Sequence, residues 1–482
     1  MRHTHRLGLP ALVILLVTTG LAATWAASRH DDPRPNVVLI TADDMTAVEL
    51  RWMPRTRRLL GREGVTFGNM VAPHPNCCPS RAQVLTGQYA HNNGVRTNSP
   101  PWGGHQGLNR ANTLPVWLQR AGYTTGFIGK YLHGYDERDG TEPGWDRWRP
   151  IIGTLSDYRA FLQYDDGELR RFGPEAYHTD VVAQQSRELV RSFAADDEPF
   201  FLWSSFLAPH GTCQGNPEPD CSGPPPAADR HAGVLGGVRL PVLDSPSFNA
   251  PGVGARRAGK RVSPSAAQGL FTQRIRALAA LDEAVAGIVT ELRRAGELDD
   301  TVLMFTSDNG YLFGEHRLVG KNVPYEEAVR VPLLVRGPGI PAGDRRSQTV
   351  AMIDLAPTVA RLAHARPLRR TDGIDFLPYA VADRPQADRA LLLQAGSKGR
   401  VKARAWKFRA VRTDRYTLVR WKVPKRRELF DRRRDPFQLT NVHGDPRYRH
   451  VRKRLTRHLR KLEDCRSQGC RRPVSELPRP LH

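Results

Sequence analysis

Residues 36–44 have the sequence Asn-Val-Val-Leu-Ile-Thr-Ala-Asp-Asp, an apolar run that ends in two acidic residues. Three further runs, at residues 125–128, 200–207 and 301–306, share this design and also lead into polar residues. Runs that are apolar at every position, rather than at alternate positions, are typical of parallel strands buried on both faces. The four runs therefore predict parallel strands of one central sheet.

Amphipathic segments lie between these runs. Residues 180–193 and 275–292 carry apolar residues at helical spacing, and Gly296 closes the second segment. Strands that alternate with helices predict an α/β fold, with a large, mixed, mostly parallel sheet sandwiched between helices. Residues 211–265 are rich in Pro and Gly, so we expect a long surface loop there that covers the site.

A second, smaller unit is predicted after a composition shift at residues 383–387. Short antiparallel strands are expected at 391–394, 408–411 and 416–421, and a basic helix over 446–462. The expected units are a signal peptide over residues 1–28, a catalytic domain over 35–382, and a C-terminal α+β subdomain over 388–482.

The N-terminal residues indicate export. Arg2 and Arg6 precede an apolar run over residues 9–23, and small residues follow at 26–28, as in a secretory signal. The run is short for a bilayer span. We expect a secreted protein without stable membrane insertion after signal removal, or one held at the cell surface if the segment stays uncleaved.

The composition excludes several classes of protein. With 482 residues, 40% hydrophobic and 25% charged, the chain is not a disordered, collagenous or multi-span membrane protein. Its 72 Lys and Arg outnumber 49 Asp and Glu, so anionic partners are attracted. Cations crowd residues 402–434 and 447–461. A nucleic-acid partner is not expected, because no recognisable nucleic-acid module is present; a sulfated glycan partner and a merely solvated surface both stay open.

The six cysteines divide into two groups. Two pairs are close enough in sequence for local disulfides, Cys213 with Cys221 and Cys465 with Cys470. Oxidation suits an exported chain. Cys77 and Cys78 are left over, and adjacent cysteines rarely bridge because the geometry is strained.

Polar residues follow the predicted strands at their carboxyl ends, where ligands bind in such sheets. The residues expected to converge there are Asp43, Asp44, Lys130, His210, Asp308 and Asn309. The segment Cys77-Cys78-Pro79-Ser80-Arg81 predicts a helix start, with free backbone N–H groups beside Cys77. Arg81, four residues on, faces the same way. This pattern predicts an anion pocket that contains a nucleophile.

The motif C-x-P-S-R followed by L-T-G resembles the signature of the type I sulfatases, members of the alkaline-phosphatase-like superfamily. The resemblance covers residues 35–445, and the sequences of several motifs are most similar to the N-acetylglucosamine-6-sulfatase and arylsulfatase branch. Further matching stretches are Asp43-Asp44, Gly129-Lys130-Tyr131-Leu132, Ala208-Pro209-His210, residues 307–311, Lys321, residues 331–339 and residues 428–442.

The resemblance implies a sulfatase that acts on sulfated carbohydrate, such as N-acetylglucosamine 6-sulfate, or on aryl sulfates. It implies that a formylglycine-generating enzyme converts Cys77 to 3-oxoalanine, whose hydrate attacks sulfur. It implies one Ca²⁺ ion, held by Asp43, Asp44, Cys77, Asp308 and Asn309. The implied catalytic residues are Cys77, with Arg81, Lys130 and Lys321 as positive clamps, and His210 as the acid for the leaving group.

One position departs from the family pattern. The family often has His two residues after Lys, but Leu132 stands there and His133 comes one residue later. His133 is therefore either the base that collapses the hydrate or a neighbour that lines the pocket. His74 and His316 are further pocket candidates. The alternative functions are a phosphatase or phosphonate monoester hydrolase of the same superfamily, and a non-catalytic polyanion-binding protein.

Overall fold

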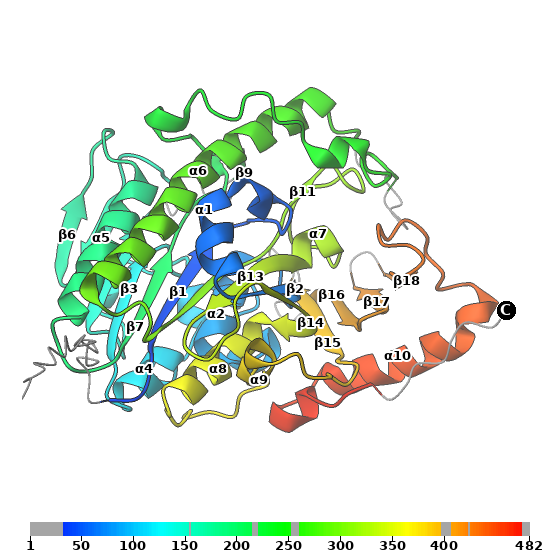
Figure 1. Ribbon diagram of the computed structural model, residues 1–482. Helices are drawn as coiled ribbons and strands as arrows, with labels where there is room; N and C mark the ends of the chain where they lie inside the picture. The colour runs from blue at the N-terminus through cyan, green and yellow to red at the C-terminus, as the bar shows by residue number, and fades with distance from the viewer. Residues whose placement is uncertain are drawn as a thin grey trace, which may run out of the picture.

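The structure is a computed structural model that describes residues 32–153, 156–214, 220–251, 260–396, 406–422 and 425–474. A ten-stranded sheet forms the centre, with helices on both faces (Figure 1). Its strands are, in spatial order, β14 (Asp344–Ala351), β2 (Val65–Val71), β13 (Arg330–Arg336), β10 (Thr301–Ser307), β1 (Asn36–Ala42), β7 (Phe200–Ser205), β3 (Thr124–Gly129), β4 (Arg147–Ile152), β5 (Leu162–Asp165) and β6 (Glu168–Arg171).

The four apolar runs are confirmed as the parallel strands at the centre of this sheet. They form β1, β3, β7 and β10, and the pairs β10–β1, β1–β7 and β7–β3 are all parallel. The sheet is mixed because β13 pairs antiparallel with both β10 and β2, and because β5 and β6 form an antiparallel hairpin at the other edge.

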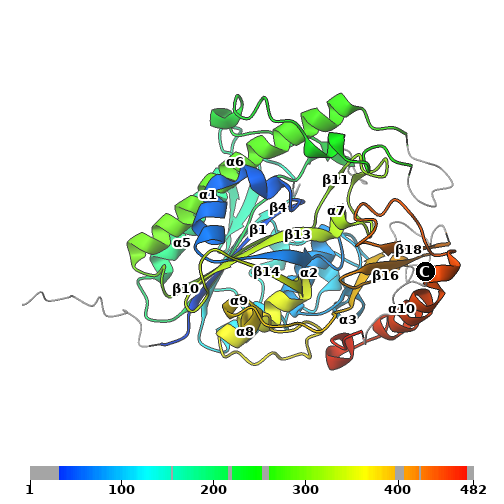
Figure 2. The ribbon, with the colours of Figure 1, turned by 45° about the vertical axis from the view of Figure 1, so that its right-hand side comes forward.

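Alternate side chains of β1 enter two different hydrophobic cores, as expected for a strand buried on both faces. Val37 and Leu39 belong to one core, and Val38 and Ile40 to the other. Figure 2 shows the helical layers on either side of the sheet. The first core is covered by α2 (Cys77–Thr86), α4 (Leu114–Gln119), α8 (Leu355–Leu362) and α9 (Leu377–Val381); the second is covered by α5 (His178–Phe193) and α6 (Pro264–Ala295).

Helix α6 is longer than the periodicity predicts. It begins at Pro264 rather than near residue 275, because Ser263 caps it through a hydrogen bond from Ala266 N at 3.4 Å. It ends as predicted at Gly296, which has φ +84°. The preceding loop contains a small hairpin of β8 (Thr212–Gln214) and β9 (Asp220–Gly223).

The C-terminal unit is an antiparallel sheet with one helix across it, as predicted. Helix α10 (Arg449–Leu462) follows a 3-10 turn over Pro446–Tyr448, so its α-helical part is shorter than expected. The strands are β15 (Leu391–Gly396), β16 (Trp406–Arg412), β17 (Tyr416–Trp421) and β18 (Arg426–Asp431), the last of which the sequence analysis did not place. One hydrophobic core joins this sheet to β2, to Tyr89 just before α3 (Ala90–Asn93), and to the short segments β11 (Leu312–Phe313) and α7 (Glu326–Val329). The boundary at 383–387 stays a prediction.

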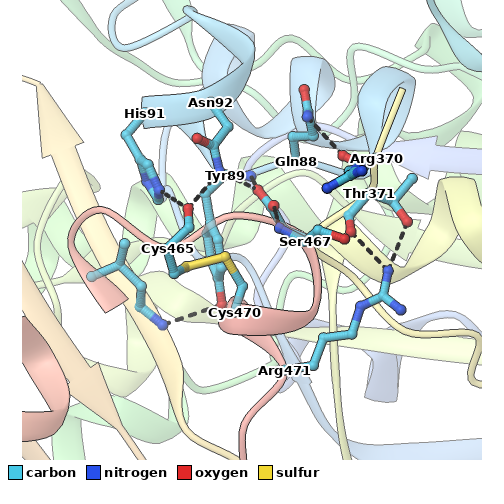
Figure 3. The surroundings of a disulfide bond; sticks show 12 residues. Gln88, Tyr89, His91, Asn92, Arg370, Thr371, Cys465, Ser467, Cys470 and Arg471 are labelled. Carbon is cyan, nitrogen blue, oxygen red and sulfur yellow. Dashed lines mark hydrogen bonds between the residues drawn. A yellow bond between two sulfur atoms is a disulfide. The ribbon is translucent and has the colours of Figure 1, made fainter. Parts of the chain in front are cut away.

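The tail beyond α10 contains a local disulfide and is held against the main unit by hydrogen bonds (Figure 3). Cys465 and Cys470 are bonded as expected, and the Cys465 carbonyl accepts a hydrogen bond from Asn92 Nδ2 at 2.9 Å. The Asp372 carboxylate accepts from Asn92 Nδ2 and from Ser467 N, both at 2.8 Å. Side chains of the main unit thus bind main-chain atoms of the C-terminal tail.

Some predictions fall outside the described residues. The expected signal peptide is among them, as is the side chain of Cys221, although Cys213 is disulfide-bonded. None of the described helices is both long and apolar enough to cross a bilayer.

A glycine that ends β3 provides a test of the fold. Gly129 has φ +101°, and a Cβ there would lie 2.0 Å from Ser205 O of β7. Gly134 has φ +85° but faces open space. Gly134→Ala should lower the free energy of unfolding by about 1–2 kcal/mol, the cost of the left-handed backbone. Gly129→Ala should lose about 1–3 kcal/mol more, from the added clash. Equal losses in urea unfolding would contradict this account.

Candidate functional site

The predicted polar residues lie together where the parallel strands end at one edge of the sheet. They are Asp43 and Asp44 after β1, Lys130 after β3, His210 beyond β7, and Asp308 and Asn309 after β10. Helix α2 begins at the same edge and adds Cys77 and Arg81. Segments that are far apart in the chain therefore build one site.

Arg81 and Lys130 compensate two buried carboxylates. Arg81 donates from Nε to Asp308 Oδ2 at 3.1 Å and from Nη2 to Asp43 Oδ2 at 3.2 Å, and Lys130 Nζ lies 2.5 Å from that second oxygen. Burial would raise the pKa of Asp43, but Lys130 and His210 hold it well below its usual value. Burial and the adjacent Asp43 raise the pKa of Asp308 to about 6.

Cys77 faces this charged cluster from the first position of α2. Its side chain is 1% exposed, and Sγ lies 2.9 Å from Lys321 Nζ and 3.5 Å from Asp43 Oδ1. Lys321 also contacts Asp44. Burial, together with Asp43, raises the pKa of the Cys77 thiol. An unmodified thiol here therefore stays protonated and is a weak nucleophile.

Cys78 points away from the cluster and toward another loop. Its backbone N–H donates to Asn98 Oδ1 at 3.1 Å, and its sulfur accepts from the backbone N–H of His133 at 3.1 Å. The His133 Nε2 atom is buried and has no hydrogen-bond partner among the described residues. Burial, followed by the charge of Lys130, lowers the pKa of His133 to about 3.

His210 turns one ring nitrogen toward the cluster. Its Nε2 lies 3.7 Å from Asp44 Oδ2, and its Nδ1 lies 2.6 Å from the Gly211 carbonyl oxygen. A carbonyl at Nδ1 assigns the proton of the neutral ring to Nδ1, which leaves Nε2 as an acceptor facing the site. Burial and Lys130 lower the pKa of this imidazole to about 4.

The oxygen-rich part of the cluster fits a divalent cation. One ligand atom from each of Asp43, Asp44, Cys77 and His210 lies within 4.8 Å of the others. Asn309 donates from Nδ2 to Asp44 Oδ1 at 2.7 Å, while its Oδ1 is buried without a partner among the described residues. Buried carboxylates together with an amide oxygen that lacks a hydrogen-bond partner are the oxygen ligands that a hard ion such as Ca²⁺ prefers.

A buried ion pair that the sequence analysis did not single out supports the cluster from behind. Arg274 of α6 pairs through Nε with Glu49 Oε1 at 2.7 Å. It also donates to the main-chain oxygens of Asp44 at 2.6 Å and of Pro209 at 3.1 Å. Asp44 has φ +66°, a conformation that L-residues adopt at a cost. Arg274 therefore joins the segments that carry Asp44 and His210.

The two other histidine candidates make contacts of their own. His74 Nε2 lies 3.0 Å from the Arg96 carbonyl oxygen, and His316 stacks on Tyr325 with ring centroids 4.2 Å apart. Both histidines are buried, and their place in the pocket stays a prediction.

The Arg274 contacts predict a large loss of stability on substitution. Arg274→Gln should lower the free energy of unfolding by about 3–5 kcal/mol, because it leaves Glu49 as an unpaired buried charge. Adding Glu49→Gln should recover part of that loss. Arg389→Gln, which breaks the buried pair with Asp354 elsewhere, is the matched control and should cost a similar amount. A loss below about 1 kcal/mol for Arg274→Gln in urea unfolding would contradict a stabilising role of the buried Arg274–Glu49 pair.

Comparisons with known proteins agree with this geometry. The family model described as Sulfatase matches residues 35–365, and a model described as N-sulphoglucosamine sulphohydrolase, C-terminal, matches residues 314–465. An arylsulfatase of Volvox carteri is 31% identical over 96% of this chain and 80% of its own length. An N-acetylglucosamine-6-sulfatase of Homo sapiens is 34% identical over 77% of this chain and 68% of its own.

Solved structures show the same fold. One, in complex with its substrate D-glucosamine-2-N,6-O-disulfate, has a TM-score of 0.74 and 22% identity, and covers 91% of this chain and 98% of that one. A phosphonate monoester hydrolase of Agrobacterium radiobacter has a TM-score of 0.69 and 21% identity, with 89% and 95% covered. Because a family model matches most of the chain and full-length relatives are sulfatases, the chain belongs to the sulfatase family and is a sulfuric ester hydrolase.

Proposed function

We propose that this sulfatase is exported and removes sulfate from carbohydrate, with esters like N-acetylglucosamine 6-sulfate ahead of aryl sulfates. The observation that carries the proposal is the setting of Cys77, at a helix start, 2.9 Å from Lys321 Nζ and beside Asp43. Export is supported by the Cys465–Cys470 disulfide, which persists in an oxidising compartment. The similarity to N-acetylglucosamine-6-sulfatases supports the substrate class.

The proposed nucleophile is formylglycine, made from Cys77 by a formylglycine-generating enzyme. When hydrated, this group supplies one hydroxyl to attack sulfur and a second to expel sulfate as the aldehyde re-forms. Lys321 and Lys130, with Nζ atoms 2.9 and 4.0 Å from the present sulfur, stabilise negative charge at this position. Arg81 keeps Asp43 and Asp308 in place, so the anionic sulfonyl group meets a rigid pocket.

The proposed metal is one Ca²⁺ ion. Its protein ligands would be Asp43, Asp44, Asp308, Asn309 and residue 77. A bound ion supplies Lewis-acid charge to a sulfate oxygen and lowers the pKa of a hydroxyl that it touches. The orphaned Asn309 Oδ1 is the residue atom that most directly supports this ligand set.

His210 and His133 are proposed to move protons. The Nε2 of His210 faces the cluster, and an anionic sulfate ester beside it favours the imidazolium, which can then donate to the leaving oxygen. His133 is proposed as the base for sulfate release, since its buried Nε2 has no partner among the described residues and lies in the field of Lys130.

Substitution of Cys77 tests the nucleophile. Cys77→Ser and Cys77→Ala should lower kcat by about 10⁴-fold or more while the fold persists, because neither residue can become the aldehyde. Cys78→Ser is the matched control and should stay active, since a hydroxyl can still accept from His133 N. Peptide mass spectrometry across residue 77 should find an aldehyde in active protein; an unmodified thiol there would overturn the proposal.

Metal removal tests the ion site. Chelation should lower activity and melting temperature together, and Ca²⁺ at a hundredfold excess over Kd should add about 2.7 kcal/mol to the free energy of unfolding. Asp44→Asn should weaken this Ca²⁺-dependent gain through lost ligand charge. Asp282→Asn, a buried carboxylate that accepts from Thr56 N at 2.7 Å, should leave the gain intact. Unchanged rates and stability in excess chelator would count against the metal.

A substrate panel separates the remaining alternatives. Sulfate release from N-acetylglucosamine 6-sulfate should exceed release from an aryl sulfate in kcat/KM. A phosphonate monoester in the same assay tests hydrolysis of phosphorus esters, and faster turnover of that compound would replace the proposed substrate class.

A further inference from the structure

Helix α10, drawn in red in Figures 1 and 2, has two opposite faces. Val451, Leu455 and Leu459 are at most 2% exposed and pack into the core of the small sheet. Exposed cations occupy the other side, and five of them form what we call the basic stripe: Arg449, Lys453, Arg457, Arg460 and Lys461. At about 100° and 1.5 Å per residue, the stripe spans an arc of about 120° and a length of about 18 Å.

Within the described part of the chain, no acidic side chain compensates the charge of the basic stripe. Helix α10 contains no Asp or Glu, and no stripe residue pairs with a carboxylate among the residues that the structure describes. The acids that flank the helix have partners: Asp445 pairs with Arg447, Glu463 with Arg420, and Asp464 with Arg409. Like charges recur along the stripe at i, i+4 spacing, and each such pair costs about 0.2–0.5 kcal/mol. A bound polyanion would relieve this repulsion.

The chemistry of the surroundings narrows the class of polyanion. A helix that enters a membrane surface needs a free apolar face, but here that face is buried in the core. The disulfide that follows α10 belongs to an oxidising compartment, where nucleic acid is not the common polyanion. Arginine matches the geometry of tetrahedral oxyanions. These observations together favour a sulfated polysaccharide.

We propose that the basic stripe binds a sulfated polysaccharide chain and gives the enzyme a second contact with its polymeric substrate. The substrate part of this inference rests on the proposed function, whereas the binding part does not. Two linked contacts raise the effective concentration of polymer at the site. A monosaccharide sulfate cannot reach both contacts. The stripe therefore affects KM for polymer and leaves turnover of small esters unchanged.

Heparin binding at several NaCl concentrations tests the stripe. The triple variant Arg449→Gln, Lys453→Gln, Arg457→Gln should raise Kd for heparin about tenfold or more at about 0.15 M salt. For this variant, the plot of the logarithm of the binding constant against the logarithm of salt concentration should become less steep by about 2–3, because fewer counterions are released on binding. The matched control removes three exposed arginines elsewhere, as Arg51→Gln, Arg58→Gln, Arg62→Gln, and should change Kd less than twofold.

Equal losses in the two triple variants would overturn the proposal, because binding would then follow net charge. Duplex DNA of matched charge is the competitor. If it displaces heparin from the wild type at equal or lower charge concentration, the stripe is a nucleic-acid surface and the glycan assignment fails. Melting temperatures of both variants should stay within about 2 °C of wild type, since the replaced side chains are exposed.

Turnover separates this inference from the proposed function. The stripe variant should keep kcat/KM for a monosaccharide sulfate and raise KM for a sulfated polymer at least threefold. An unchanged KM for polymer would overturn the role in substrate capture. Cys77→Ala should bind heparin as the wild type does. If neither the wild type nor the stripe variant releases sulfate from any sugar, the proposed function fails. The binding surface still stands if heparin binding depends on the stripe.

Discussion

The compensation of three buried carboxylates is the constraint on which the site depends. Asp43, Asp44 and Asp308 are at most 2% exposed, and like charges this close and this deep stay ionised together only when cations surround them. The compensating side chains are Arg81, Lys130 and Lys321. The same charges that stabilise the carboxylates also create the electrostatic setting for an anionic ester. In the proposed mechanism, stability and activity therefore share one network, and a change to one member affects both.

The fold supplies this network through ordinary sheet geometry. Parallel strands buried on both faces bring their carboxyl ends to one edge, and the two hydrophobic cores hold those ends rigidly. Gly129 lets β3 approach Ser205 closely enough to aim Lys130 inward. Arg274 then fixes the backbone beyond β1 and β7, so positional accuracy comes from main-chain contacts as well as side-chain pairs.

The sequence predicted the strand ends and their polar residues, because a continuous apolar run reveals a doubly buried strand and its end. It also predicted Arg81 beside Cys77, since helical spacing is local. It could not predict Arg274, whose partners are main-chain oxygens of segments 65 and 230 residues away. It named His74 and His316 as pocket candidates, but it could not show the contacts of His74 with the Arg96 carbonyl and of His316 with the Tyr325 ring.

The contacts that close the site also set an order of events during synthesis. Helix α2 is secured by bonds from Ser80 to the Asp308 carbonyl and from Arg81 to the Asp308 carboxylate, across separations of 228 and 227 residues. In a chain that emerges from its N-terminus, position 77 therefore stays open to solvent until the segment around residue 308 has arrived. Afterwards it is 1% exposed and inaccessible to a second protein. Any enzyme that modifies this side chain therefore has to act before folding closes the site, on either the nascent or the complete but still unfolded polypeptide.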